Sequence, residues 1–237
     1  MSAASALDMH DFRDAEAQAA ALAASVAEDL RAGIAARGTA ALAVSGGSTP
    51  KTFFAQLARQ SLDWMRVVVT LVDERWVPDT DVRSNAKLVK ETLLQGVAAA
   101  ARFVPLYTGA ATPEAGLAEA TARIDALPSP FDVVVLGMGE DGHTASFFPG
   151  GDHLAAAVDP RGTAQVLPMH APAAGEPRIT LTLPVLLATR ALYLLVRGEA
   201  KRDLLADVRL GLDGAKDYPV WAVVHQHAVP LSVYWSP

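Results

Sequence analysis

The stretch FDVVVLGMGEDGH, residues 131–143, decides the fold class of this chain. Its first half is a continuous apolar run rich in valine, which is typical of a strand buried on both faces of a parallel sheet. Its second half is a glycine-rich turn that carries two acids and a histidine. A strand that ends in such a turn predicts a ligand site at the edge of an α/β sheet.

The rest of the chain alternates between helical and strand-like patterns. Helices are expected over 11–36, from Pro50 onward, from Ser84 to Leu94, over 113–127 and over 199–209, and further strands over 41–45, 66–72, near 164–169, over 191–197 and over 231–235. This alternation predicts an α/β fold, a mostly parallel sheet flanked by helices. With no long linker or internal repeat, we expect a single domain over 1–237.

The composition excludes several classes of site and partner. Because there is no cysteine, disulfides, thiolate zinc sites and cysteine nucleophiles are excluded, which fits a reducing cytoplasm. A net charge of −6 without a long Lys/Arg cluster argues against nucleic acid. No apolar run is long enough to span a membrane, and the first residues lack the pattern of a signal peptide. We therefore expect a cytoplasmic protein, and a monomer, since no interface helix stands out.

Three polar motifs follow three of the expected strands. They are SGGSTP at 45–50, DERWVP at 73–78 and GMGEDGH at 137–143. In an open α/β sheet, ligands bind at the carboxyl ends of the parallel strands. We therefore expect these motifs to meet in a single site, although they lie far apart in sequence.

The SGGSTP motif has the features of an anion site. Gly46 and Gly47 allow positive φ angles and a close approach of a ligand to the backbone. Ser48 and Thr49 add hydroxyls, and Thr49 is placed to cap a helix beginning at Pro50, where free N–H groups favour phosphate. The lysine of a Walker loop is missing, so an ATP cradle is not indicated. A plain strand-to-helix turn is the alternative.

The DERWVP motif places two acids and an arginine at a strand end. Arg75 is a candidate for pairing with a substrate anion or stabilising an oxyanion. Asp73 is either a base or a partner that holds Arg75. The alternative is a local ion pair on the surface.

The GMGEDGH motif allows four interpretations. A dinucleotide site needs a long helix directly after the glycines, but Pro149 and Gly150 cut that helix short. A metal site would use Asp141, His143 and His153, but this spacing is a weak signal. His143 can instead be a general base and acid, because histidine titrates near neutrality. A structural histidine is the fourth interpretation.

These motifs resemble those of the 6-phosphogluconolactonase family over nearly the whole chain. The matching segments are SGGSTP, VDERWVP with the following Ser84-Asn85, LGMGEDGHTASFFPG, Arg178 in PRITLTLP, and Lys201 after VRGEA. The resemblance implies a Rossmann-like fold of the NagB/RpiA/CoA transferase type. It also implies hydrolysis of 6-phospho-D-glucono-1,5-lactone to 6-phospho-D-gluconate, the second step of the oxidative pentose phosphate pathway, without a metal or organic cofactor.

The resemblance also implies a role for each candidate residue. His143 would deprotonate the attacking water and later protonate the departing ring oxygen, while Arg75 would orient the substrate or stabilise the oxyanion. Asp73 would support either Arg75 or His143. The 6-phosphate would be held by Gly46, Gly47, Ser48, Thr49, Arg178 and Lys201.

Two other functions remain as alternatives. The related glucosamine-6-phosphate deaminases share the glycine loop and resemble this chain at Asp73 and Asp141-Gly142-His143, but need a glutamate where this chain has Phe148. A sugar-phosphate sensor without turnover would keep the anion site, but the presence of His143 and Arg75 argues against it. A nicotinamide-binding protein is the function that the sequence favours least.

Overall fold

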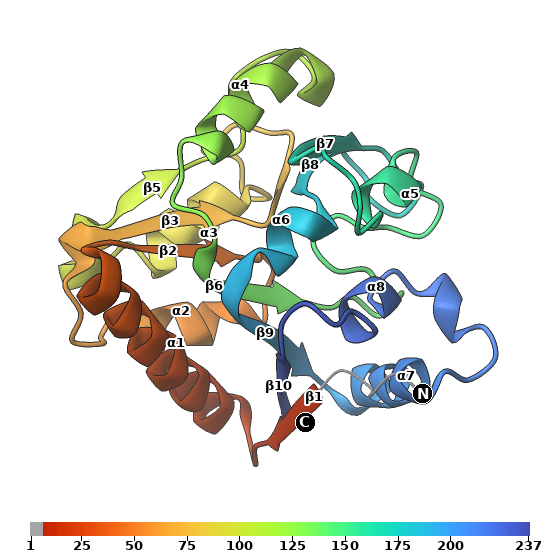
Figure 1. Cartoon of the computed structure of the whole chain (residues 1–237), viewed down its shortest axis with the longest axis horizontal. Coiled ribbons are helices and arrows are strands. Elements are labelled where there is room, and N and C mark those ends of the chain that lie inside the picture. The colour runs from red at the N-terminus through yellow and green to blue at the C-terminus, as the bar shows by residue number, and fades with distance from the viewer. Residues whose placement is uncertain (1–6) are drawn as a thin grey trace.

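The valine-rich strand β6 (Phe131–Gly137) lies at the centre of a seven-stranded sheet in the computed structural model, which describes residues 7–237 (Figure 1). All neighbouring strands of this sheet run parallel. In the order in which they pair, the strands are β1 (Leu7–Asp11), β10 (Leu231–Ser236), β9 (Thr189–Arg197), β6, β2 (Ala40–Val44), β3 (Val67–Leu71) and β5 (Arg102–Val104).

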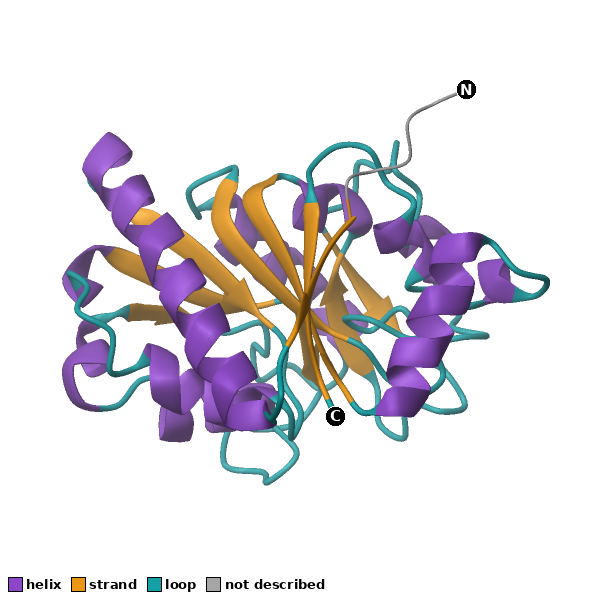
Figure 2. Ribbon diagram, turned by 90° about the horizontal axis from the view of Figure 1, so that it is seen from below, coloured by secondary structure: helices purple, strands orange, loops and turns teal. Residues whose placement is uncertain are grey.

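Helices lie to either side of this sheet, as Figure 2 shows. Because both faces are covered, every residue of β2 and β3 is buried, as their apolar runs predicted. The helices are α1 (Ala15–Arg37), α2 (Pro50–Leu57), α3 (Asn85–Thr92), α4 (Pro113–Asp125), α5 (Leu154–Ala157), α6 (Leu183–Leu187), α7 (Glu199–Leu210) and α8 (Trp221–Val224). The predicted α/β fold with a mostly parallel sheet is confirmed. Within residues 7–237, no helix combines the length and apolar character needed to cross a membrane.

A second, three-stranded antiparallel sheet stands beside the first and was not predicted. It consists of β4 (Asp73–Arg75), β8 (Arg178–Leu181) and β7 (Val166–Met169), paired in that order. The DERWVP motif therefore follows strand β3 of the main sheet and also contributes a strand to the small sheet. Its first residues form an edge strand of the small sheet, in which Arg75 lies opposite Arg178.

The first helix starts later than the predicted range of 11–36. It begins at Ala15, because the carboxylate of Asp14 caps it by accepting a hydrogen bond of 2.8 Å from a backbone N–H of the first turn. The residues before it form β1, at the edge of the main sheet. The predicted end is confirmed, since Gly38 follows the helix with a left-handed φ of 80°.

Candidate active site

A pocket at the carboxyl ends of β2, β3 and β6 brings the three polar motifs together. It has a volume of about 260 Å³. The side chains and backbone around it include Gly46, Gly47, Ser48, Thr49, Asp73, Arg75, Asn85, His143, Arg178 and Lys201. The convergence predicted from the sheet is therefore observed. The roles of the individual residues remain predictions.

The SGGSTP loop is packed tightly against its neighbours. A β-carbon added to Gly46 would lie 1.8 Å from the side-chain oxygen of Asn85, so only glycine fits there. Gly47 has a φ of 103°, which favours glycine for a different reason. Ser45 ties the loop to β6, since its hydroxyl donates to the carbonyl of Val135 at 3.0 Å. These contacts restrict the conformations that the loop can adopt.

The capping prediction for Thr49 was only partly right. Thr49 does precede Pro50 at the start of α2. Its backbone is already helical, however, with φ −60° and ψ −45°, and its side chain makes no capping hydrogen bond. The hydroxyl is therefore available to the pocket that Thr49 lines.

Two cations reach the pocket from the C-terminal half of the chain. Lys201 lies in the first turn of α7, and within residues 7–237 it takes part in no ion pair. Arg178 is the first residue of β8 and is 7% exposed, so it is a buried cation that lines the pocket. Burial lowers the pKa of Arg178, an effect that the carboxylate of Asp73 opposes. A buried cation of this kind is suited to an anionic ligand.

The guanidinium of Arg178 is only partly satisfied by protein groups. One terminal nitrogen donates to the carbonyl of Ala174 at 2.8 Å. The same nitrogen lies 3.8 Å from a carboxylate oxygen of Glu176. The Nε atom is buried and has no hydrogen-bond partner among the described residues. The group therefore retains donors for a ligand.

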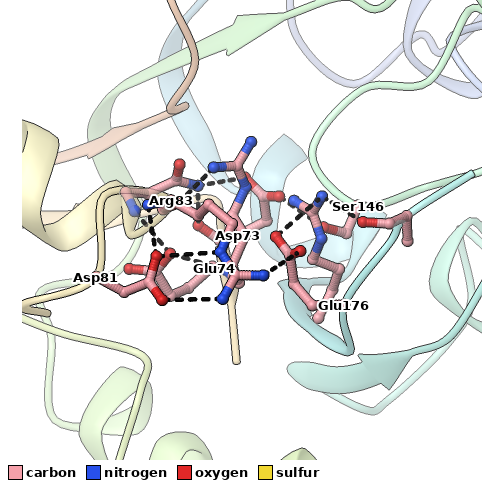
Figure 3. Close-up of polar contacts among 10 residues, drawn as sticks. Asp73, Glu74, Asp81, Arg83, Ser146 and Glu176 are labelled. Carbon is pink, nitrogen blue, oxygen red and sulfur yellow. Dashed lines mark hydrogen bonds and ion pairs between the residues drawn. The ribbon is translucent and has the colours of Figure 1, made fainter. Parts of the chain in front are cut away.

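Glu74 organises the strand that carries Asp73 and Arg75. It is fully buried, and its carboxylate accepts backbone N–H bonds of 2.7 Å from Arg75, Asn85 and Ala86 (Figure 3). Burial raises the pKa of Glu74 to about 7, and the three backbone donors lower it less than burial raises it. Glu74 thereby fixes β4 to the start of α3.

The expected support of Asp73 for Arg75 or His143 does not take the form of a hydrogen bond. One carboxylate oxygen of Asp73 accepts from the hydroxyl of Ser146 at 2.5 Å, and its backbone carbonyl accepts from the amide of Asn85 at 3.0 Å (Figure 3). Asp73 is thus held by the turn that follows His143 and by α3. It lines the pocket.

Arg75 is held from the opposite side. A terminal nitrogen of Arg75 donates to the carbonyl of Arg83, and its Nε atom is buried without a partner among residues 7–237. Arg83 in turn forms ion pairs with Asp81 at 2.9 Å and Glu176 at 3.0 Å, as Figure 3 shows. These contacts position the Arg75 side chain at the pocket.

His143 is fixed in its slot by contacts on several sides. Its Nδ1 atom lies 2.5 Å from a carboxylate oxygen of Asp141. Its ring stacks on Phe148 with 4.4 Å between the centroids. A β-carbon on Gly139 would lie 2.2 Å from Nδ1, so the backbone there closes on the ring edge. The Asp141 contact favours the tautomer protonated on Nδ1, which leaves Nε2 as the acceptor.

The metal and dinucleotide interpretations of this turn have no support in the geometry. Asp141 is engaged with His143, whereas His153 lies 3.1 Å from Asp152. In the described part of the chain, no three histidine and carboxylate side chains are grouped as metal ligands would be. The glycines lead into a short turn, and α5 starts only at Leu154, too late for a dinucleotide motif.

The sequence matches one known protein family over most of its length. The model of the family described as "Glucosamine-6-phosphate isomerases/6-phosphogluconolactonase" matches residues 13–235. The chain belongs to this family. The hypothesis drawn from the motifs is confirmed at the level of the family.

Individual members of the glucosamine-6-phosphate isomerase/6-phosphogluconolactonase family are similar over their full length. The 6-phosphogluconolactonase of Rhizobium meliloti (strain 1021) is 52% identical, with 97% of this chain and 99% of that protein covered. That of Mesorhizobium japonicum is 49% identical, covering 95% and 94%. The crystal structure of a 6-phosphogluconolactonase from Shewanella baltica OS155 has a TM-score of 0.93 and 39% identity, covering 98% of both chains.

Four residues of the site were given no role from the sequence. They are Asp141 beside His143, Ser146 and Asn85 beside Asp73, and Phe148 beneath His143. Asp141 was considered as a metal ligand and as part of the Asp141-Gly142-His143 match, and the other three lay within matching segments without a role. Asn85 and Ser146 come next to Asp73 only after β4, α3 and the turn after β6 have come together.

Proposed function

We propose that the protein is a 6-phosphogluconolactonase, which hydrolyses 6-phospho-D-glucono-1,5-lactone to 6-phospho-D-gluconate. The observation that carries this proposal is that one pocket contains both groups suited to bind an anion and an oriented histidine. The anion site comprises the SGGSTP loop with Arg178 and Lys201, and the histidine is His143. The reaction is the second step of the oxidative pentose phosphate pathway.

The anion site would hold the 6-phosphate of the substrate. Backbone N–H groups at a helix start and charge-assisted bonds from two cations suit a phosphate dianion. The phosphate lies at the end of the substrate opposite the reacting carbonyl. Its binding energy can therefore be used to position that carbonyl at His143.

His143 would move the protons of the reaction. Its Nε2 atom accepts a proton from a water molecule, whose oxygen attacks the lactone carbonyl. The carbonyl oxygen becomes an oxyanion, which the guanidinium of Arg75 stabilises. When the tetrahedral intermediate collapses, the bond from C1 to the ring oxygen breaks, and protonated His143 gives its proton to that oxygen. The product is the open-chain acid, and His143 is again neutral.

Two variants separate anchoring from chemistry. His143→Ala should lower kcat by about 10²- to 10⁴-fold and leave KM nearly unchanged, because it removes the proton shuttle. Arg178→Ala should mainly raise KM, because it removes a phosphate contact. The measurement is hydrolysis of freshly generated lactone, with the spontaneous opening subtracted. A full kcat in His143→Ala would disprove the assignment of the base.

The two alternatives give different results in the same preparation. Release of ammonia from glucosamine 6-phosphate would establish the deaminase, and Phe148, at the position where deaminases need a glutamate, argues against it. Phosphosugar binding with a rate no better than that of His143→Ala would establish the sensor. We further propose that the enzyme acts as a monomer in the cytoplasm on this phosphorylated sugar lactone.

A further inference from the structure

The aromatic ring of Phe148 contacts both chemical halves of the pocket. The side chain is 3% exposed and comes from the turn after β6. Its ring stacks on that of His143 with a centroid distance of 4.4 Å and an interplanar angle of 29°. The guanidinium carbon of Arg178, from β8 in the other sheet, lies 5.3 Å from the same ring centroid. One side chain thus touches the base and a cation of the anion site.

His143 needs this contact to be fixed in orientation. The bond to Asp141 holds the position of Nδ1, and the backbone at Gly139 closes on that edge of the ring, but both contacts act at the edge and leave the plane of the imidazole free to tilt. The flat face of Phe148 opposes that tilt. The direction in which Nε2 points into the pocket is therefore set by Asp141 and Phe148 together.

Arg178 needs the same contact for a different reason. It lies directly opposite Arg75 in the ladder of β4 and β8, so two like charges are neighbours. Its Nε atom has no hydrogen-bond partner in the part of the chain described. The negative face of an aromatic ring attracts a guanidinium within about 6 Å of its centroid. Phe148 therefore helps to hold Arg178 beside Arg75 before a ligand arrives.

We propose that Phe148 is a positioning residue that sets His143 and Arg178 relative to each other. Because its rigid ring contacts both side chains, Phe148 fixes the distance between the base and the phosphate site. The carbonyl of the bound substrate is thereby placed at Nε2 only when both contacts are made. This inference rests on the proposed lactonase function for its kinetic consequences, but the two contacts themselves can be tested without turnover.

The test replaces the ring by apolar side chains without a flat face. Phe148→Leu and Phe148→Met are compared with Phe131→Leu, because Phe131 is similarly buried, at 4%, but lies at the amino end of β6, away from the pocket. The readouts are kcat and KM for the lactone, the affinity for inorganic phosphate, measured both by inhibition and by thermal shift without turnover, and the NMR signals of the His143 ring. These signals are assigned by their loss in His143→Gln.

Both Phe148 variants should lower kcat by about tenfold or more, since misplacement of a catalytic group by about 1 Å can cost 10²-fold. They should also weaken inhibition by phosphate about three- to tenfold, the size of a lost cation–π contact. The His143 signals should shift, because the ring current of Phe148 is gone. Phe131→Leu should change stability alone.

Three outcomes would overturn the proposal. Unchanged kcat and phosphate inhibition would reduce Phe148 to a packing residue. A change in kcat alone, or in phosphate inhibition alone, would show that the ring does not support both His143 and Arg178. Unshifted His143 signals would contradict the stacking. Absence of lactonase activity in the wild type would instead refute the proposed function, and the phosphate and NMR readouts would still test Phe148.

Discussion

The imidazole of His143 has one nitrogen available for chemistry, because the other is held by Asp141 at 2.5 Å. In the described residues, Asp141 is the one carboxylate within salt-bridge distance of this ring. We therefore expect Asp141 to choose the tautomer and to stabilise the imidazolium that would form during turnover. From the sequence, Asp73 was expected to support either Arg75 or His143, and Asp141 was given no such role.

Asp141→Asn should therefore lower kcat by about 10²-fold or more with little change in KM. An asparagine can present its amide to Nδ1 and favour the wrong tautomer. Steady-state kinetics on the lactone give the answer. Asp217→Asn serves as the control for a general change of charge, because Asp217 and Asp141 line the same neighbouring cavity. Equal effects of the two substitutions would contradict a specific role for Asp141.

Gly46 and Gly47 are required for different reasons, and substitutions should separate them. Gly46→Ala should weaken inhibition by phosphate at least about tenfold, because the new methyl group overlaps the amide of Asn85 and the loop must shift. A methyl group at Gly47 would have no atom of residues 7–237 within 4 Å, so Gly47→Ala should cost only the backbone strain of a positive φ, about 1 to 3 kcal/mol.

Combining Gly46→Ala with Asn85→Ala provides the critical control. If overlap with the amide causes the loss, the double variant should bind phosphate better than Gly46→Ala alone. Titration with phosphate, followed by thermal shift, measures both. A double variant that is worse than either single variant by the full sum of the two effects would disprove the overlap.

At the scale of elements, β4 and α3 form one unit around the carboxylate of Glu74. Three backbone N–H groups from two elements point at this buried side chain, and the hydroxyl of Ser84 adds a fourth donor at 3.1 Å. The unit carries Asp73 and Arg75 on one side and Asn85 on the other. Its stability is therefore also that of one wall of the pocket.

The raised pKa of Glu74 makes the stability of this unit depend on pH. Since the folded protein holds the proton up to about pH 7, whereas an unfolded glutamate loses it near 4.5, this group's contribution is full below pH 4.5 and is lost as the pH rises to 7. The free energy of unfolding should fall by up to about 3 kcal/mol across this window, relative to Glu74→Gln. Urea unfolding of both proteins at several pH values measures the difference. A constant difference would mean that Glu74 has an ordinary pKa.

The sequence predicts the long elements of the fold better than the short ones. The helix α4 has enough residues for a clear periodicity and the strand β6 for a clear apolar run, and both were found where expected. β4 and β8 are three and four residues long, carry charges and pair with each other across a large part of the chain, so no local pattern marks them. Arg178 was assigned to the phosphate site through the family resemblance alone, because its local sequence does not show that the small sheet buries it.

The site follows the same rule. The motifs at the ends of β2, β3 and β6 could be brought together by topology alone, since parallel strands share an edge. The contacts among side chains could not, because Ser146 meets Asp73, and Phe148 meets Arg178, across the gap between two sheets. Sequence thus predicts which segments form the pocket, and the packing of the elements decides which atoms touch.

At the scale of the whole molecule, one apolar core connects the helices and both sheets. Buried residues of the core cluster include Trp76 next to the small sheet and Trp235 in β10 of the main sheet. A shared core predicts that the two sheets lose their structure together.

Thermal or urea unfolding should therefore follow one transition with every probe. Fluorescence of a variant that keeps Trp76 alone and of one that keeps Trp235 alone should change at the same denaturant concentration, and both should coincide with far-UV circular dichroism. The two Trp probes would separate if the small sheet melted on its own. Such a separation would also contradict the expectation of a single domain.

The pairing of β1 with β10 has a consequence for how the protein is made. Leu7 lies opposite Leu231, so the first described strand has no partner in the sheet until the ribosome has synthesised nearly all of the sequence between them. During translation, β1 therefore stays unpaired while the inner strands are synthesised. A contact across so much chain is slow to form, and an unpaired strand is open to wrong partners in the meantime. β1 is short, and LDMHD contains two aspartates. Both features reduce wrong pairing of an exposed strand.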